Sequence, residues 1–185
     1  LCIFYGGLLR QQTKFKVLYD NENLYMLIIS NFEDENYVVS SLKRDWSSRN
    51  NDSMTLVLDT FNDERRAFAF QVNPFGVQMD GIYDDVNQRE DQSWNAIWDS
   101  VGQITESGYT VELSIPLKQL RFPATNSEQI WGIDLYRHYP RNRSTMIHSQ
   151  RIDWDISCYL CQISTLEGFN TVSYTHLTLP TILPV

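Results

Sequence analysis

The sequence has no apolar run long enough to cross a membrane. The longest, around "NLYMLIIS", covers only a strand's length, whereas a membrane helix needs about 18 apolar residues in a row. The first residues, "LCIFYGGLL", have no basic start and no small-residue cleavage site, so they match a signal peptide poorly. We therefore predict no membrane span in this segment. The chain opens at Leu1 rather than Met, and we expect residues 1–11 to be the edge of a fragment.

Positive charge is scarce. The 15 lysine and arginine residues are outnumbered by 23 aspartate and glutamate residues, which gives a net charge of −8 and a pI near 4.8. Affinity for nucleic acids comes largely from clustered basic side chains. The composition therefore argues against a nucleic-acid partner.

Cysteine is nearly absent. Besides Cys2, the chain has only Cys158 and Cys161, in "CYLC". A zinc site would need a second pair of ligands, and only His138 and His148 lie nearby in the sequence. A redox motif would need a helix start in a βαβ context, which the pattern does not show. We expect two thiols in a terminal strand or turn.

Glycine and proline are also few, with 8 and 6 residues, whereas 42% of the chain is hydrophobic and 13% is aromatic. This composition excludes disordered and fibrous classes. A chain of 185 residues can bury one sizeable core and is short for two. We expect one globular domain.

Signatures of enzymes are missing, since the chain has no G-x-S-x-G, H-E-x-x-H, P-loop or G-x-G-x-x-G motif. Glycoside hydrolysis would need two carboxylates about 5–10 Å apart across a sugar. Glu112 and Asp134, both in the middle of predicted strands, could face each other across a sheet. A solvated sheet face explains them equally well, and we predict that the domain is not an enzyme.

The dominant pattern is alternation with a period of two, in short segments separated by polar turns, which predicts half-buried strands. Eight segments show it: 14–20, 24–30, 53–61, 67–73, 76–83, 96–105, 108–116 and 130–139. The first two are predicted to form one hairpin and the next two another, and "ESG" at 106–108 signals a further tight turn. Only residues 91–98 and 116–122 look helical. The predicted fold class is all-β, a sandwich or a barrel.

The stretch "MDGIYDDVNQREDQSWNAIWDS" combines acidic and aromatic residues. Asp80, Asp84 and Asp85 could supply the oxygen ligands of a calcium ion, although "DDVNQREDQ" lacks the glycine and the final glutamate of an EF-hand. Alternatively, the same stretch could bind a sugar, with aromatic rings for its apolar face and polar side chains for its hydroxyls. Both interpretations stay open from the residues alone.

The five tryptophans divide by context. Trp131 alternates in phase with Ile133 and Leu135, and Trp98 falls in a predicted strand, so we expect both in the core. Trp46 and Trp94 occupy polar loops, where an indole has less reason to be. We expect these two to be the better candidates for ligand contact.

Three longer stretches carry a family resemblance: "LDTFNDERRAFAFQVNPFGVQMDGIY", "SWNAIWDSVGQITESGYTVELSIPLKQLRFP" and "WGIDLYRHYPR". With them, the chain resembles the family 9-like carbohydrate-binding domain, in the version found at the N-terminus of large bacterial secreted or outer-membrane proteins. The resemblance runs from about Gln12 to Asn170. It implies a jelly-roll-like antiparallel β-sandwich that binds glycans without cutting them, with aromatic side chains gripping the sugar and calcium helping to hold the fold.

We accordingly predict a carbohydrate-binding domain over residues 12–170. The residues expected to contact a polysaccharide or oligosaccharide are Trp46, Tyr83, Trp94 and Arg137, and the residues expected to hold calcium are Asp80, Asp84 and Asp85. The parent is expected to be exported to the periplasm, the outer membrane or the medium, to act in glycan breakdown or uptake, and to continue into a C-terminal region. The alternatives are a structural domain that packs on a C-terminal outer-membrane barrel without binding sugar and, third, a glycoside hydrolase.

The last residues do not continue the strand pattern. The segment "VSYTHLTLPTILPV", residues 172–185, contains no charged side chain of the Lys, Arg, Asp or Glu type. It resembles translated read-through of a sequencing adapter, and we expect residues 171–185 to be a non-native tail.

Overall fold

The computed structural model describes residues 3–6, 12–31, 37–46, 51–124, 128–141 and 144–170, with the backbone alone for residues 3–6. Almost all regular structure in these ranges is strand. The strands are β1 Ile3–Gly6, β2 Thr13–Tyr19, β3 Asn23–Asn31, β4 Ser53–Asp59, β5 Arg66–Val72, β6 Gln78–Asp84, β7 Arg89–Asp91, β8 Asp99–Thr105, β9 Gly108–Pro116, β10 Gln129–Pro140, β11 Ser144–His148 and β12 Ser164–Phe169. Two short 3₁₀ helices are η2 Leu117–Gln119 and η3 Leu160–Gln162.

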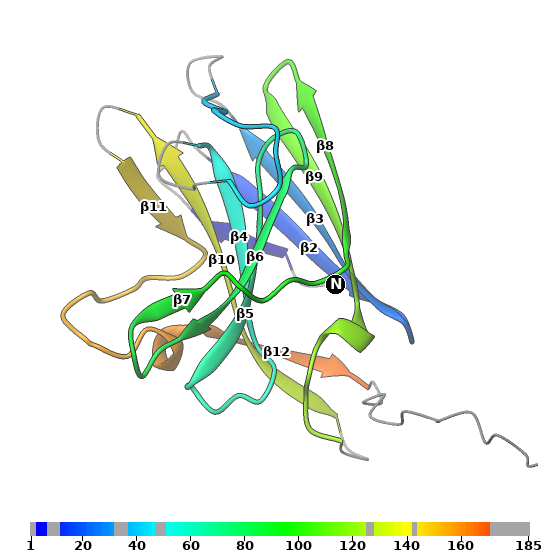
Figure 1. The fold of residues 1–185 in the computed structure, drawn as a ribbon, viewed down its shortest axis with the longest axis vertical. Coiled ribbons are helices and arrows are strands. Elements are labelled where there is room, and N and C mark those ends of the chain that lie inside the picture. Colours follow the sequence, from blue (N-terminus) through cyan, green and yellow to red (C-terminus); the bar gives the residue numbers. More distant parts are fainter. Residues whose placement is uncertain are drawn as a thin grey trace, which may run out of the picture.

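The strands form two antiparallel sheets that pack face to face (Figure 1). The smaller sheet has the order β1-β2-β3-β9-β8, and the larger has the order β11-β10-β4-β5-β6-β7. β12 pairs with the first half of β10 and β11 with its second half, so both lie along the same edge of that strand. The predicted jelly-roll-like β-sandwich is confirmed.

Alternation along the strands builds the core between the sheets. On β4, Met54, Leu56 and Leu58 are fully buried in this core, and their β5 partners in the register include Phe70 and Val72. From the other sheet, β3 and β9 bury their own alternate apolar residues against them. Both predicted hairpins, β2-β3 and β4-β5, are confirmed by these registers.

Trp131 is fully buried in the core and packs against two phenylalanine rings. Its ring centroid is 4.8 Å from that of Phe169 on β12 and 5.3 Å from that of Phe122. The indole Nε1 donates a hydrogen bond to Oε1 of Gln129, so its polar atom is satisfied inside the core. Trp131 and Trp98 are both buried, as their positions in the sequence predicted.

Four strands were not predicted from the sequence: β1, β7, β11 and β12. β7 is three residues long and exposed throughout, so it has no apolar alternation to detect. β1 pairs with β2 although we expected residues 1–11 to lie outside the domain. The predicted tail, residues 171–185, lies outside the described residues.

Residues 116–122 looked helical in the sequence, but only the short 3₁₀ helix η2 forms there. Residues 92–98 form no regular element. Each segment is only about two helical turns long, and so short a helix is unstable on its own. Within the described ranges, no helix reaches the length and hydropathy of a membrane-spanning one.

Gly108 marks the tight turn between β8 and β9, where Thr105 pairs directly with Gly108. A methyl group at this position would overlap the backbone carbonyl oxygen of Ser30 on β3. We therefore expect Gly108→Ala to lower the free energy of unfolding by about 1–3 kcal/mol, because the overlap is with backbone that can move little. Urea unfolding measures it. The exposed neighbour substitution Ser107→Ala should change stability by less than about 0.5 kcal/mol, and equal effects of the two would contradict the close approach.

Candidate functional site

The outer face of the larger sheet carries a hollow of about 320 Å³. It lies between β7 and the segment that connects β11 to β12, drawn in orange in Figure 1. We call it the aromatic hollow; it is lined by Val57, Ala69, Tyr83, Gln88, Arg89, Glu90, Tyr136, Met146, His148, Ile152, Trp154, Ile156, Ser157, Tyr159 and Gln162. Cavities that bind small molecules usually have about 300–1,000 Å³, so its size fits a small ligand or one unit of a polymer.

Small residues on the central strands create the hollow, and aromatic residues on the flanking strands wall it. Val57 of β4 and Ala69 of β5 are register partners and both are buried. Tyr83 on β6 and Tyr136 on β10 stand on either side of them. Because the side chains of a strand alternate between faces, these residues all point away from the core that Phe70 and Leu56 occupy.

Trp154 is the most exposed aromatic residue of the hollow, with 66% of its surface accessible. It sits in a turn that Asp153 shapes, since the Asp153 side chain accepts a hydrogen bond from the backbone N–H of Asp155. Gln162 fixes the same turn from η3: its Oε1 accepts from the N–H of Asp153, and its Nε2 donates to the carbonyl of Cys158. The indole is therefore held on an ordered turn with its surface open.

Two residues of the β6–β7 turn hold the connecting segment against the sheet. Oδ1 of Asp85 accepts hydrogen bonds from the backbone N–H groups of Tyr159 (2.9 Å) and Leu160 (3.2 Å). Gln88 donates to the carbonyl oxygen of Ser157 at 2.8 Å. These contacts join residues more than 65 positions apart in the sequence. These hydrogen bonds fix the position of the connecting segment, which forms one wall of the hollow.

A buried carboxylate lies under the aromatic rings. Asp134 of β10 has no exposed surface and accepts hydrogen bonds from three side chains: His148 Nδ1 at 2.6 Å, Tyr159 Oη at 2.6 Å and Ser149 Oγ at 2.7 Å. Burial alone would raise the pKa of Asp134, but these hydrogen bonds outweigh it and hold the pKa below its ordinary value. Asp134 therefore stays ionised and orients His148 and Tyr159.

The rings form a continuous group around this carboxylate. The centroid of His148 lies 5.0 Å from Tyr136, 5.6 Å from Trp154 and 5.8 Å from Tyr159, and Tyr159 lies 5.5 Å from Tyr83. Burial raises the pKa of Tyr83 and Tyr136 to about 12. Both phenols are protonated at neutral pH, and the hydroxyl of Tyr83 donates a hydrogen bond to Oε1 of Gln88 at 3.3 Å.

Glu90 adds an acceptor at the rim beside β6. Its Oε1 accepts a hydrogen bond from Gln71 at 3.2 Å. A side chain at Gly81 would bring a Cβ within 3.1 Å of that same oxygen, so glycine at this position leaves room for Glu90 to lie across the sheet. Loss of water around the carboxyl raises the pKa of Glu90, and the Gln71 hydrogen bond offsets this in part. Polar groups thus flank the rings of the hollow.

Of the four side chains predicted to contact sugar, the structure places only Tyr83 in the hollow. The exposed position expected for Trp46 is wrong: it is 4% exposed, and its Nε1 donates to the carbonyl of Val77. Arg137 is buried on the core side of β10, where it lies 3.8 Å from Asp52 and donates to the carbonyl of Asn31. Both are closed off from a ligand by burial, and neither belongs to the site we propose.

Trp94 is half-buried rather than displayed on a loop. Its ring lies 5.0 Å from Phe68 and 5.8 Å from Phe70, both of which face the other sheet. The polar sequence around Trp94 hid this packing, because the apolar partners are contributed by β5. It does not line the aromatic hollow.

The three aspartates predicted to hold calcium do not come together in the described residues. Asp80 is buried and accepts hydrogen bonds from Arg44 at 2.6 Å and from the backbone of Ala96. Asp84 accepts from Asn87 and pairs with Arg66 at 3.3 Å. With Asp85 engaged by η3, each carboxylate already has protein donors. As a set they do not fit a calcium ion, and calcium has no part in the function proposed below.

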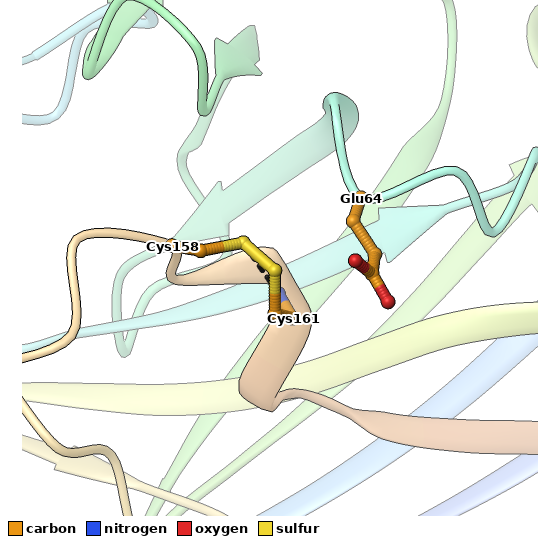
Figure 2. Close-up of side chains that lie close together, drawn as sticks. All are labelled: Glu64, Cys158 and Cys161. Atoms are coloured by element: carbon orange, nitrogen blue, oxygen red, sulfur yellow. Dashed lines mark hydrogen bonds between the residues drawn. A yellow bond between two sulfur atoms is a disulfide. The ribbon is translucent and has the colours of Figure 1, made fainter.

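Cys158 and Cys161 form a disulfide, so the expected pair of free thiols is wrong. Figure 2 shows the bond beside η3, with the carboxylate of Glu64 close by. Within the described residues, these three are the one group of potential ligands close enough for a metal. Sulfurs joined in a disulfide carry no thiolate to coordinate an ion, so this group is not a metal centre.

The disulfide closes a short loop that carries Tyr159 of the hollow. In a Cys2→Ser background, we expect Cys158 and Cys161 to resist alkylation until a reductant is added. Replacing both by serine should lower the free energy of unfolding by at most about 2 kcal/mol, since the closed loop is short. Mass spectrometry after alkylation and urea unfolding provide the measurements. Alkylation of both residues without reductant would contradict the bond.

Glu112 and Asp134, the candidate pair for hydrolysis, belong to different sheets. Glu112 is exposed on the outer face of the smaller sheet, on β9, and Asp134 is buried on the outer face of the larger one. The two sheets separate them, so the possibility that they face each other across a sheet is not borne out. Among the described lining residues, Glu90 is the one carboxylate of the hollow.

Tyr136, His148, Trp154 and Tyr159 were missed as site residues. Trp154 stands in "RIDWDIS", a polar context of the kind that drew attention to Trp46 and Trp94, so the same criterion could have found it. Tyr136 alternates out of phase with Trp131 and the other core residues of β10, which marks it as facing outward. No pattern in the sequence pointed to His148 or Tyr159, because Asp134 orients them from another strand.

The two sheets and the aromatic hollow define a β-sandwich with a ligand-sized cavity on one outer face. The sequence model of the "Carbohydrate family 9 binding domain-like" family matches residues 9–155. This covers most of the chain, and the protein belongs to that family of non-catalytic binding domains. The resemblance in the sequence is thereby confirmed. A search of curated proteins finds no significant match.

Solved structures share the fold at low sequence identity. A candidate carbohydrate-binding protein from Bacteroides uniformis ATCC 8492 is 9% identical with a TM-score of 0.66, over 89% of this chain and 85% of that one. A family 9 carbohydrate-binding module from Caldicellulosiruptor kristjanssonii in complex with cellotriose is 16% identical with a TM-score of 0.56, over 98% and 87% of the two chains. The same kind of module in complex with glucose is 15% identical, also at 0.56, over 92% and 81%.

Proposed function

We propose that this domain binds a neutral saccharide in the aromatic hollow and does not cleave it. The observation that carries the proposal is the exposed indole of Trp154 beside the rings of Tyr83, Tyr136 and Tyr159, around a space of about 320 Å³. Nothing in the core requires an exposed indole there, since Trp154 has no part in either buried cluster.

The chemistry of the walls matches a sugar ring. The carbon face of a pyranose is apolar and packs on aromatic rings, whereas its hydroxyls need hydrogen-bond partners at the edges. The hollow offers both, with aromatic rings as walls and the carboxylate of Glu90 as a hydrogen-bond acceptor at its rim. Its arrangement on strands and on an anchored turn limits the entropy lost on binding.

A glucan or xylan chain is the class of ligand that we propose. The modules of the same family from Caldicellulosiruptor kristjanssonii, solved in complex with cellotriose and with glucose, support a glucose-based ligand here. The hollow is open at the surface of the sheet rather than enclosed, which suits one unit of a polymer whose neighbours continue outside.

We further propose that the domain works in an exported protein that breaks down or takes up polysaccharides. The disulfide between Cys158 and Cys161 supports an oxidising compartment, because such bonds persist outside the cytosol. Neither alternative is favoured by the structure. A purely structural domain has no need of an aromatic hollow, and a glycosidase of the usual type needs two carboxylates across the sugar.

The test is calorimetric titration of the protein with cellotriose, xylotriose and maltotriose. We expect saturable binding to at least one of the first two, and unchanged saccharide after long incubation. A folded protein, shown by its cooperative thermal transition, that gives no heat with any of them would overturn the proposal. Release of shorter sugars would overturn the non-catalytic part of it.

A further inference from the structure

A second and larger cavity, of about 630 Å³, opens at the end of β5 and β6. It shares no lining residue with the aromatic hollow. We call it the arginine-rimmed cavity; it is lined by Thr60, Phe61, Asp63, Arg65, Arg66, Ala67, Phe68, Ile82, Asp84, Val86, Asn87 and Arg121. Three of the chain's 15 basic residues meet here, in a protein whose net charge is −8.

Of the three arginines that line the cavity, one forms an ion pair in the described residues. Arg66 forms an ion pair with Asp84, and hydrogen bonds from Asn87 lower the pKa of Asp84, so this carboxylate is ionised. Asp63 accepts a hydrogen bond from the backbone N–H of Arg65. In the part of the chain that the structure describes, the guanidinium groups of Arg65 and Arg121 make no ion pair. Three positive and two negative side chains leave an excess of one positive charge at the rim.

Apolar surface is displayed between these charges. Among the lining residues, Phe61 is 52% exposed and Val86 is 72% exposed. Phe68 on β5 and Ile82 on β6, both half-buried, add further apolar lining. A ligand that fits must therefore combine a negative group with an apolar face.

The walls of the cavity are fixed by hydrogen bonds. Asp59, at the end of β4, accepts from the backbone N–H groups of Phe61 and Glu64, and so shapes the loop that carries Arg65. The hydroxyl of Thr60 donates to the carbonyl oxygen of Arg121, which ties the two walls together. The cavity is thus formed before any ligand arrives.

We propose that the arginine-rimmed cavity binds a carboxylate-bearing sugar, such as a uronic acid unit of an acidic polysaccharide. A guanidinium group pairs with a carboxylate through two parallel hydrogen bonds, a geometry that a hydroxyl cannot match. The ring of Phe61 offers the surface for the carbon face of the sugar. The volume of about 630 Å³ leaves space for more than one unit.

Calorimetry with trigalacturonic acid and with its methyl ester tests the assignment, because the ester keeps the rings and removes the charge. We expect the acid to bind with an affinity that falls as salt is added, and the ester to bind at least tenfold more weakly. The variant Arg65→Gln/Arg121→Gln should weaken binding of the acid at least tenfold. Both side chains are exposed, so the fold should persist. Lys16→Gln, which removes a positive charge on the other sheet, should leave binding of the acid unchanged.

Three outcomes would overturn the inference. They are no binding of the acid, equal affinity for acid and ester, and an affinity for the acid that the arginine variant does not change. Cellotriose binding separates this inference from the function proposed above: Arg65→Gln/Arg121→Gln should leave it intact. Loss of the acid ligand in a Trp154→Ala variant would instead place it in the aromatic hollow and would contradict a second site.

Discussion

Replacing Asp134 by alanine is expected to lower the free energy of unfolding by about 3–5 kcal/mol, the largest effect of any single substitution on this outer face. The carboxylate is fully buried and accepts hydrogen bonds from His148, Tyr159 and Ser149. Its removal leaves three donors in a space closed to water, and each unsatisfied donor costs free energy. Urea unfolding at neutral pH provides the measurement.

The same carboxylate makes stability depend on acid. Because the pKa of Asp134 is lower in the folded protein than in the unfolded chain, its contribution is fully present above the unfolded value, near 4. It is lost as the pH falls below about 4 and through the folded pKa. Asp134→Asn removes the ionisable group while keeping its shape, so this part of the acid sensitivity should disappear in that variant.

Asp99→Ala is the matched control for Asp134→Ala. Asp99 is exposed on β8, and its replacement should change stability by less than about 0.5 kcal/mol. If the two alanine variants unfold at the same urea concentration, Asp134 does not organise the rings of the hollow as described.

Replacing Trp154 by alanine is expected to weaken saccharide binding at least tenfold, which corresponds to about 1.4 kcal/mol. The indole is the most exposed ring of the hollow, and aromatic residues that a ligand covers on binding commonly contribute much of the binding energy. Since the ring is mostly in solvent, the free energy of unfolding should change by less than about 0.5 kcal/mol. Titration calorimetry with cellotriose and urea unfolding separate the two effects.

Phe75→Ala tests whether the loss of any exposed aromatic ring would weaken saccharide binding to the same extent. Phe75 is 43% exposed and contacts Tyr37, away from the hollow. Its replacement should leave the affinity for the saccharide unchanged. Equal loss in both variants, or no loss in the Trp154 variant, would contradict the site.

The fold could be predicted because the apolar alternation that determines it lies within each single strand. Alternation at Met54, Leu56 and Leu58, repeated on the neighbouring strands, indicates which face of each strand packs in the core between the sheets. Two such faces cover each other. Strands without this alternation, such as β7, are held by pairing with Ile82 and Tyr83 of β6 rather than by their own composition. The three polar residues of β7 show no pattern from which this pairing could have been predicted.

The site was less predictable because its residues meet only after folding. Trp46 and Trp154 both stand among charged residues, yet the first is buried, with its indole N–H bonded to the carbonyl oxygen of Val77, and the second is open to solvent. Sequence context could not distinguish them, since what covers Trp46 comes from another segment. Tyr83, expected to contact a sugar, does line the hollow, and its contact with a sugar stays a prediction.

The acidic stretch shows the same limit. Asp80, Asp84 and Asp85 are close in sequence, but each binds a different partner: Arg44, Asn87 and the start of η3. Clustering along a chain does not imply a shared ligand: Asp80 and Asp84 share a face of β6 but lie roughly 13 Å apart along the strand, and Asp85 follows the end of β6. Asp85 proves to be a positioning residue for the wall of the hollow.

Titration with cellotriose, followed through the indole N–H signals in a ¹⁵N–¹H correlation spectrum, tests the central claim most directly. The chain has five tryptophans, so five such signals are expected. Trp46, Trp98 and Trp131 are buried, and Trp94 packs on Phe68 and Phe70. We predict that the Trp154 signal moves furthest and saturates with the calorimetric affinity. A Trp154 signal that stays in place while that of Trp94 shifts would contradict the account and locate the sugar elsewhere.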